Sequence, residues 1–301
     1  MKLEVKNLKK SFGSKEVLKG ISFTCNSGGA IGLLGRNGAG KTTTIRTVIG
    51  IISRDEGEVL LDGEPFKSYY PSIGYLPEER GLYPKLKLID QMTYFASLRG
   101  ITEKQAKKNL DFWLERMDMT EYRNSTFETL SKGNQQKIQL ILSLLHDPKI
   151  LILDEPFSGL DPVNAQMLKD VVIECIKGDK IVIFSSHQMN FVEEFCEEVL
   201  MINKGEIVLD GNLNQIKRGY ERKKLYIRAR GNPGNITEDL QIPGVLQTEP
   251  FNDGYLLHLD TEDRCKDVFT VLHEKGHDVD NFNLVELTLN DIFIKKVGDD
   301  E

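Results

Sequence analysis

Residues 35–42 read Gly-Arg-Asn-Gly-Ala-Gly-Lys-Thr and match in full the phosphate-loop pattern G-x-x-x-x-G-K-[ST]. That pattern carries meaning where it follows a strand and opens a helix. The compact apolar run 30–34 predicts the strand, and the helical spacing of residues 41–52 predicts the helix. We therefore expect an α/β fold in which this loop binds a nucleoside triphosphate. The alternative is a glycine-rich turn with a chance lysine.

The chemistry of the loop follows from its residue types. Glycines allow the backbone to curl so that successive N–H groups point at phosphates, and the start of the next helix adds positive dipole. Lys41 would reach the β- and γ-phosphates, and the Thr42 hydroxyl would ligate Mg²⁺. The predicted nucleotide-binding residues of this stretch are Gly35, Arg36, Asn37, Gly38, Ala39, Gly40, Lys41, Thr42 and Thr43.

Two adjacent carboxylates, Asp154 and Glu155, follow the aliphatic run 150–153. A strand there would carry both to the C-terminal edge of the sheet, where open α/β folds bind ligands. Asp154 would hold Mg²⁺ directly or through water, and Glu155 would orient and deprotonate the attacking water as general base. Taken alone, the pair fits solvated acids at an ordinary strand end equally well.

The segment around this pair alternates strands and helices. We expect strands at 149–153 and 180–185, helices at 162–177 and 190–199, and a closing strand at 206–209. Such alternation implies a parallel sheet with right-handed crossovers.

Three other stretches differ from this pattern. Residues 2–7 and 16–25 alternate as short strands, which predicts an antiparallel start. In residues 85–130, apolar side chains recur at helical spacing between charged ones, which predicts a helical subdomain. The charged run 217–224 indicates a domain boundary, so we expect one domain at 1–218 and a second at 219–301.

The second domain is expected to be a small α+β unit. Its predicted strands are 225–230, 254–259 and 284–287, and its predicted helix is 264–274.

Composition excludes several classes of protein. The net charge of −7 argues against a general nucleic-acid binder, because such proteins neutralise phosphates with Lys and Arg. The four cysteines form no CxxC pair, so a zinc or redox motif is not expected. No apolar run reaches the roughly 18 residues of a membrane span, and the start lacks the apolar core of a signal peptide. We therefore expect a cytosolic chain whose pore, if it powers transport, lies on another polypeptide.

A further motif names a family. Residues 130–136, Leu-Ser-Lys-Gly-Asn-Gln-Gln, open a predicted helix and resemble the ABC signature sequence LSGGQ, with Lys132 in place of the first glycine. Ser131, Gly133 and Asn134 would form a second anion site at a helix N-terminus. By resemblance to this family, the signature closes over ATP held by another subunit, which implies a head-to-tail homodimer. Alone, the stretch would be read as a serine cap on a surface helix.

The remaining motifs follow in the order of that family. Asp161, in Ser158-Gly-Leu-Asp161, matches the D-loop and also fits the N-cap of a helix that begins with Pro162. His187 matches the switch histidine, which would contact the γ-phosphate and the attacking water. Phe12 matches the aromatic residue that stacks on adenine, although an early Phe is more often a core residue.

Glu78 departs from the family pattern. It stands in Tyr75-Leu-Pro-Glu78, where most members have Gln. A carboxylate would be a charged ligand for Mg²⁺ or its waters, whereas Gln offers a neutral carbonyl. The open alternative is that Glu78 is paired with its neighbour Arg80.

The resemblance covers residues 1–215 and implies a P-loop NTPase core of ABC type with an antiparallel β subdomain and a helical subdomain. It implies an ATP-hydrolysing transporter subunit that uses ATP and Mg²⁺, works as a homodimer, and lies on the inner face of the membrane through an integral permease. The tail, 287–294, resembles the C-terminal extension of exporter ATPases. The alternatives are an ABC ATPase without a membrane partner, such as a cofactor-assembly scaffold, and a regulatory member that does not hydrolyse ATP.

Overall fold

The computed structural model describes residues 1–66, 73–79, 81–230 and 236–297 of the chain. The chain divides into two compact units, Met1–Leu213 and Asn214–Glu301. No helix among the described residues is long and apolar enough to cross a bilayer.

A mainly parallel sheet forms the centre of the first unit. Among the described residues it has six strands in the order β10-β9-β3-β8-β7-β6, and only β10 runs antiparallel to its neighbour. Every residue of β3, β7 and β8 is buried, as expected for parallel strands covered on both faces. The strands are β3 (Ala30–Leu34), β6 (Ile73–Leu76), β7 (Ile150–Asp154), β8 (Ile181–Ser186), β9 (Glu198–Asn203) and β10 (Glu206–Asn212).

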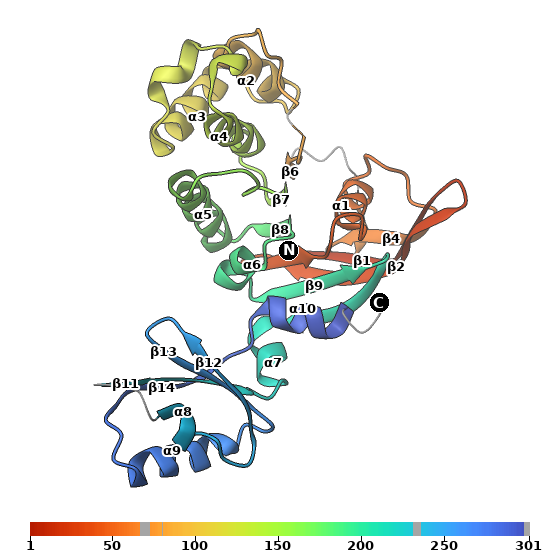
Figure 1. Ribbon diagram of the computed structural model, residues 1–301. Coiled ribbons are helices and arrows are strands. Elements are labelled where there is room, and N and C mark those ends of the chain that lie inside the picture. The colour runs from red at the N-terminus through yellow and green to blue at the C-terminus, as the bar shows by residue number, and fades with distance from the viewer. Residues whose placement is uncertain (67–72, 80, 231–235, 298–301) are drawn as a thin grey trace. The chain divides into compact units, whose positions relative to one another are not determined.

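A second sheet in this unit is antiparallel, with the order β2-β1-β4-β5. Its strands are β1 (Lys2–Phe12), β2 (Lys15–Asn26), β4 (Glu56–Leu61) and β5 (Glu64–Pro65). Alternate side chains of β1 and β2 join those of β3, β7, β8 and β9 in one hydrophobic core, so the two sheets share their interior. Helix α1 (Lys41–Val48), labelled in Figure 1, adds Ile45 and Val48 to this core.

The helices of the first unit follow the strands closely. α5 (Pro162–Lys177) has the predicted bounds, because Asp161 caps it and Pro162 occupies its first turn. α1 ends at Val48 rather than at residue 52, because Gly50 adopts a left-handed φ of 75° after the cap. The helix predicted at 190–199 is wrong at its end: α6 spans Met189–Phe195, and Glu198 already begins β9.

Two helices lie within the insert predicted at 85–130, and one follows it (Figure 1). α2 (Leu88–Ser97) and α3 (Glu103–Arg116) pack against each other, and 3-10 turns at Thr120–Asn124 and Phe127–Thr129 lead to α4 (Lys132–Leu144). The buried residues of α3, Ala106, Leu110 and Leu114, are spaced at the helical period.

The second unit is an antiparallel sheet in the order β12-β13-β11-β14, covered on one face by helices. The helix predicted at 264–274 is confirmed as α9, whereas the strand predicted at 284–287 is β14, at Val279–Val285. Strand β12 was not predicted. The elements are α7 (Leu213–Arg218), β11 (Lys224–Ala229), α8 (Ile236–Asp239), β12 (Val245–Phe251), β13 (Gly254–Leu259), α9 (Arg264–Glu274), β14 (Val279–Val285) and α10 (Leu289–Val297).

Candidate active site

The phosphate loop joins β3 to α1, as its pattern predicts. Gly35 and Gly40 have φ values of 154° and 114°, in the region that L-residues with side chains rarely adopt. A Cβ at Gly35 would lie 2.3 Å from the carbonyl oxygen of Ile202 on β9. At Gly38, φ is 80° and no atom would lie within 4 Å of an added Cβ, so the loop is open on that side. The glycines therefore allow the loop to pack closely against β9 at Gly35, while the loop at Gly38 has no close neighbour.

Lys41 begins α1 and is only 6 % exposed. Its ammonium donates to the carbonyl oxygens of Gly35 at 2.8 Å and Arg36 at 3.4 Å. Its Nζ also lies 3.5 Å from Oε1 of Glu155. The ammonium is thus held inside the loop, where it neutralises a buried carboxylate.

Asp154 ends β7 and is fully buried. Its Oδ1 accepts hydrogen bonds from Thr42 Oγ1 at 3.2 Å and from Ser185 Oγ at 2.5 Å. Its Oδ2 is buried and has no hydrogen-bond partner among the described residues. Burial raises the pKa of this carboxyl, and the bonds from Ser185 and Thr42 oppose that rise. An orphaned carboxylate oxygen beside a threonine hydroxyl fits a small hard cation.

Glu155 follows at once, in a left-handed backbone conformation with φ 51°. Its N–H lies 3.2 Å from the carbonyl oxygen and 3.1 Å from the hydroxyl oxygen of Ser185, on the neighbouring strand β8. Its Oε2 lies 2.9 Å from Nδ1 of His187, which comes just after β8. The Glu155 side chain is 7 % exposed and that of His187 is 44 % exposed, so the carboxylate is buried and the imidazole lies between it and solvent-accessible space.

One cavity of about 510 Å³ brings many of the predicted residues together. Phe12 ends β1 and lines this cavity with about half of its surface exposed. Glu78 lines it too, and forms no ion pair with another described residue; Arg80 lies outside the described residues. The lining consists of Phe12, Lys15, Val17, Asn37, Gly38, Gly40, Lys41, Thr42, Thr43, Glu78 and Glu155.

The signature residues do not line that cavity. Ser131 caps α4, its Oγ accepting from the N–H of Asn134 at 3.3 Å. Asp161 caps α5 in the same way, accepting from the N–H groups of Val163 at 3.1 Å and Asn164 at 3.0 Å. The chain therefore has two separate groups of predicted site residues, one around the phosphate loop and one at the starts of α4 and α5.

Sequence reasoning missed three residues of the first group. Ser185 donates to the carboxylate of Asp154 and accepts from the backbone N–H of Glu155. Its signal was its place near the end of the strand beside β7, where it pairs in register with Asp154. Lys15 and Val17, on β2, line the cavity beneath Phe12. Nothing local in the sequence marks these two, because the antiparallel sheet alone brings them to the loop.

Comparison with known proteins agrees with this geometry. The family model for the ABC transporter domain matches residues 18–158, and that for the C-terminal domain of DrrA1-3-like ATP-binding proteins matches residues 211–297. The chain is 44 % identical over 301 residues to the uncharacterized ABC transporter ATP-binding protein YhaQ of Bacillus subtilis, covering 98 % of each chain. It is 30 % identical over 233 residues to the lipopolysaccharide export system ATP-binding protein LptB of Haemophilus influenzae, covering 75 % of this chain and 96 % of LptB.

Among solved structures, the ATP-binding subunit of an ABC transporter superposes with a TM-score of 0.68 at 29 % identity, covering 73 % of this chain and 93 % of that one. This likeness confirms the predicted α/β ABC-type fold class. The similarity to YhaQ spans both units of the chain. The chain therefore belongs to the family of ABC transporter ATP-binding proteins, the ATPase subunits that energise transport through separate membrane permeases.

Proposed function

We propose that this chain hydrolyses Mg²⁺-ATP in a head-to-tail homodimer and thereby drives export through a membrane permease. The observation that carries the proposal is the position of Glu155. Its carboxylate lies between Lys41 and His187, beside the cavity lined by the phosphate loop. This arrangement suits a base held next to a triphosphate, and it argues against a regulatory member that does not hydrolyse ATP.

Each residue then has a chemical task. The loop N–H groups and Lys41 bind the phosphates, while Phe12 stacks on the adenine. Glu155 accepts a proton from the attacking water, and His187 orients that carboxylate through their shared hydrogen bond. Lys41 exchanges its contacts with the loop carbonyls for the phosphate oxygens as charge develops there.

Thr42 and Asp154 would hold Mg²⁺, and Glu78 would contribute a third oxygen ligand. Bound Mg²⁺ supplies charge neutralisation of the phosphates. The described residues contain no cluster of three or more His, Cys, Asp or Glu side chains placed for a metal. A site with few protein ligands suits Mg²⁺, which keeps several waters and is bound largely through phosphates.

The dimer is proposed because the signature residues stand apart from the phosphate loop. Ser131, Gly133 and Asn134 offer a serine hydroxyl and backbone N–H groups at the start of a 13-residue helix. They do not line the cavity of their own chain. A second copy, placed head to tail, would bring them over the ATP of its partner, and Asp161 would contact the same interface.

Light scattering of the purified chain tests the dimer. We expect the Glu155→Gln variant to bind Mg²⁺-ATP without turnover and to double its mass. Adding Ser131→Arg should keep the chain monomeric while ATP still binds, whereas adding Gln105→Arg, exposed on α3, should leave the dimer intact. Dimerisation of the Ser131→Arg chain would remove the signature from the interface.

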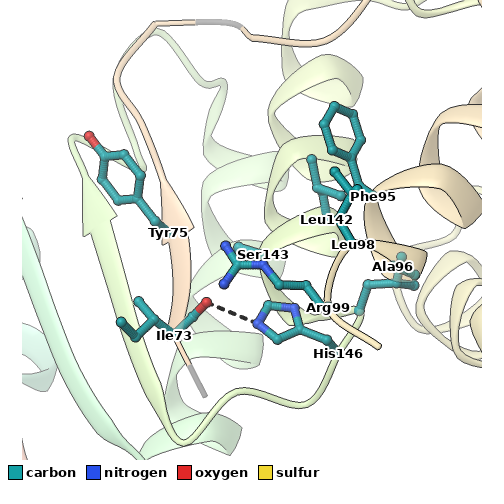
Figure 2. A pocket seen from close by; sticks show the side chains of 10 residues that line it. Ile73, Tyr75, Phe95, Ala96, Leu98, Arg99, Leu142, Ser143 and His146 are labelled. Carbon is teal, nitrogen blue, oxygen red and sulfur yellow. Dashed lines mark hydrogen bonds between the residues drawn. The ribbon is translucent and has the colours of Figure 1, made fainter. Parts of the chain in front are cut away.

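A second cavity supports docking of the permease. It has a volume of about 230 Å³ and is formed by β6, the end of α2 and the end of α4 (Figure 2). Figure 2 shows Phe95, Leu98 and Leu142 on one side and Arg99 beside His146. The His146 ring bonds the carbonyl oxygen of Ile73 at 2.9 Å. Apolar walls with a few polar groups suit a short segment of another protein, and Glu78 comes two residues after the end of β6.

Membrane fractionation tests the docking proposal. Leu98 lines the second cavity and is 63 % exposed, so Leu98→Asp should leave ATP binding intact. We expect this variant to leave the membrane fraction of the native host, together with any integral membrane protein at matched stoichiometry. Leu246→Asp, on a strand of the second unit and 71 % exposed, is the matched control. Recovery of soluble partners alone with the unmodified chain would favour an ABC ATPase without a permease.

The proposal also covers the direction of transport and the location of the chain. The relative LptB is named for an export system, and residues 211–297 match the C-terminal domain of DrrA1-3-like proteins. We assign export on the likeness to LptB, with the chain bound to the inner face of the membrane through its permease. Residues 219–301 would act as an accessory domain.

A further inference from the structure

Residues 156–161 connect the proposed base Glu155 to helix α5, and helix α4 contacts this segment at both of its ends. At the first end, Gln136 Nε2 donates to the carbonyl oxygen of Pro156 at 3.1 Å. Gln136 is buried, with 6 % of its surface exposed. Because Pro156 follows Glu155 directly, this bond fixes α4 against the backbone that carries the base.

At the second end, the contact runs through Asn164. Its Nδ2 donates to Oδ2 of Asp161, and its backbone N–H donates to Oδ1 of the same carboxylate at 3.0 Å. These bonds lower the pKa of Asp161, so the carboxylate remains charged and keeps accepting both. The same Nδ2 lies against Gly133: a Cβ built there would be only 2.7 Å from it. The amide of Asn164 thus fills the space between the start of α4 and the Asp161 turn.

We infer that Asn164 is a positioning residue that ties the signature group of each chain to the Glu155–Asp161 segment of the same chain. The inference rests on the proposed head-to-tail dimer. In that dimer, Ser131 and Gly133 contact the ATP of the partner, whereas Glu155 serves the ATP bound by its own chain. The Asn164 side chain therefore transmits the arrival of one ATP to the base that acts on the other, and it sets turnover without contacting nucleotide itself.

The chemistry of Asn explains why it is suited to this place. Its amide donates to a carboxylate, and its side chain is short. If residue 133 had a Cβ, that atom would lie 3.1 Å from Cγ and 3.6 Å from Cβ of Asn164. The substitution Asn164→Asp would keep the shape of the side chain, but it would place a second carboxylate against that of Asp161, and the two would repel each other. Ala in its place keeps only the Cβ, at an ordinary van der Waals distance from a side chain at 133.

A double-mutant cycle on the full-length chain tests the tie. Gly133→Ala pushes the amide off Asp161, and Asn164→Ala removes it, so both changes break one contact. We expect Asn164→Ala to lower kcat about fivefold and Gly133→Ala to lower it at least as much, because Gly133 also contacts the partner's ATP in the proposed dimer. The double variant should lose about as much as Gly133→Ala alone, instead of the product of the two single losses that independent effects would give. Asn164→Asp should lose as much as Asn164→Ala. A loss in the double variant equal to the product of the two single losses, or wild-type kcat in Asn164→Ala, would overturn the inference.

Two further measurements separate positioning from other causes. Binding of a fluorescent ATP analogue to the single chain should be unchanged in Asn164→Ala, because Asn164 does not line the phosphate-loop cavity. Gln166→Ala, which removes an exposed side chain bonded to Asp170 on the same helix, should keep wild-type kcat. Weakened binding in Asn164→Ala would show a folding defect and would contradict the inference. Glu155→Gln, measured in parallel, tests the proposed function separately, because its retained activity would refute the base whatever the cycle gives.

Discussion

The Nδ1 of His187 lies 2.9 Å from Oε2 of Glu155, although the two residues are 32 positions apart in the chain. Strands β7 and β8 are neighbours in the sheet, so their ends deliver both side chains to one edge. The other carboxylate oxygen lies 3.5 Å from Lys41 Nζ. The carboxylate is therefore oriented from two sides, with little freedom to leave the position from which it would deprotonate water.

This geometry predicts the effect of Glu155→Gln. The amide keeps a hydrogen bond to His187 but cannot accept a proton, so kcat for ATP hydrolysis should fall by about 10²–10³-fold with little change in ATP affinity. Phosphate release and binding of a fluorescent nucleotide measure the two effects. Glu206→Gln, which removes an exposed partner of Lys19, should retain full activity. Turnover that survives in Glu155→Gln would transfer the role of base to another group.

Glu78→Gln restores the residue that most members of the family have at this position. Glu78 is exposed and lines the cavity, which places its carboxylate where a cation bound with the nucleotide would lie. We expect the Mg²⁺ concentration for half-maximal activity to rise by about threefold to tenfold, because one charged oxygen ligand becomes neutral. Glu79→Gln, the exposed neighbour, is the control. An unchanged Mg²⁺ dependence would exclude Glu78 as a ligand of the ion or its waters.

Phe12→Ala tests the adenine contact. Stacking of an aromatic ring on a base contributes about 1–3 kcal/mol, so KM for ATP should rise by at least fivefold while kcat changes little. Phe12→Tyr should restore the affinity, since it keeps the ring. Phe112→Ala, on α3 with 59 % of the residue exposed, serves as control. Equal KM values for Phe12→Ala and the unmodified chain would show that adenine binds elsewhere.

His146 makes stability depend on pH. Burial lowers the pKa of this histidine below its ordinary value of 6.5. Between the lowered pKa and 6.5 the unfolded chain binds the proton and the folded chain does not, so stability is present above that window and is lost as pH falls through it. His146→Gln should therefore show a smaller loss of urea midpoint than the unmodified chain between about pH 7.5 and about pH 5.

The matched control for that experiment is His273→Gln, which changes an exposed histidine on α9. Its urea midpoint should follow the pH dependence of the unmodified chain. If His146→Gln and the unmodified chain lose the same amount over this range, another group is responsible for the pH dependence.

Local chemistry explains which elements the sequence predicts well. The bounds of α5 are correct because Asp161 and Pro162 encode its start within two residues. The predicted place of the phosphate loop between β3 and α1 is correct because its glycines adopt positive φ values that other residues rarely adopt. For the candidate site, the pattern correctly places Asp154 and Glu155 at the end of a buried strand, and their chemical roles stay predictions.

Elements that depend on tertiary pairing were predicted less well. Residues 196–199 fit the helical period, but the backbone of β9 pairs with β3 from Glu198 onward, and this pairing overrides the local pattern. β12 was missed because it is an edge strand with Pro250 and several polar residues, and it is defined by its backbone pairing with β13. Ser185 was missed for the same reason: its role exists only once β7 and β8 lie in register.

The left-handed backbone of Glu155 has one more consequence. A residue with a Cβ at φ 51° carries a conformational penalty of roughly 1–2 kcal/mol that glycine would not. Replacement by glycine would relieve that penalty and delete the carboxylate in the same step. The same change would also leave the buried Lys41 ammonium without its counter-charge, which costs more than the strain that is relieved. Selection for heat resistance alone should therefore keep a carboxylate at this codon despite its strained backbone.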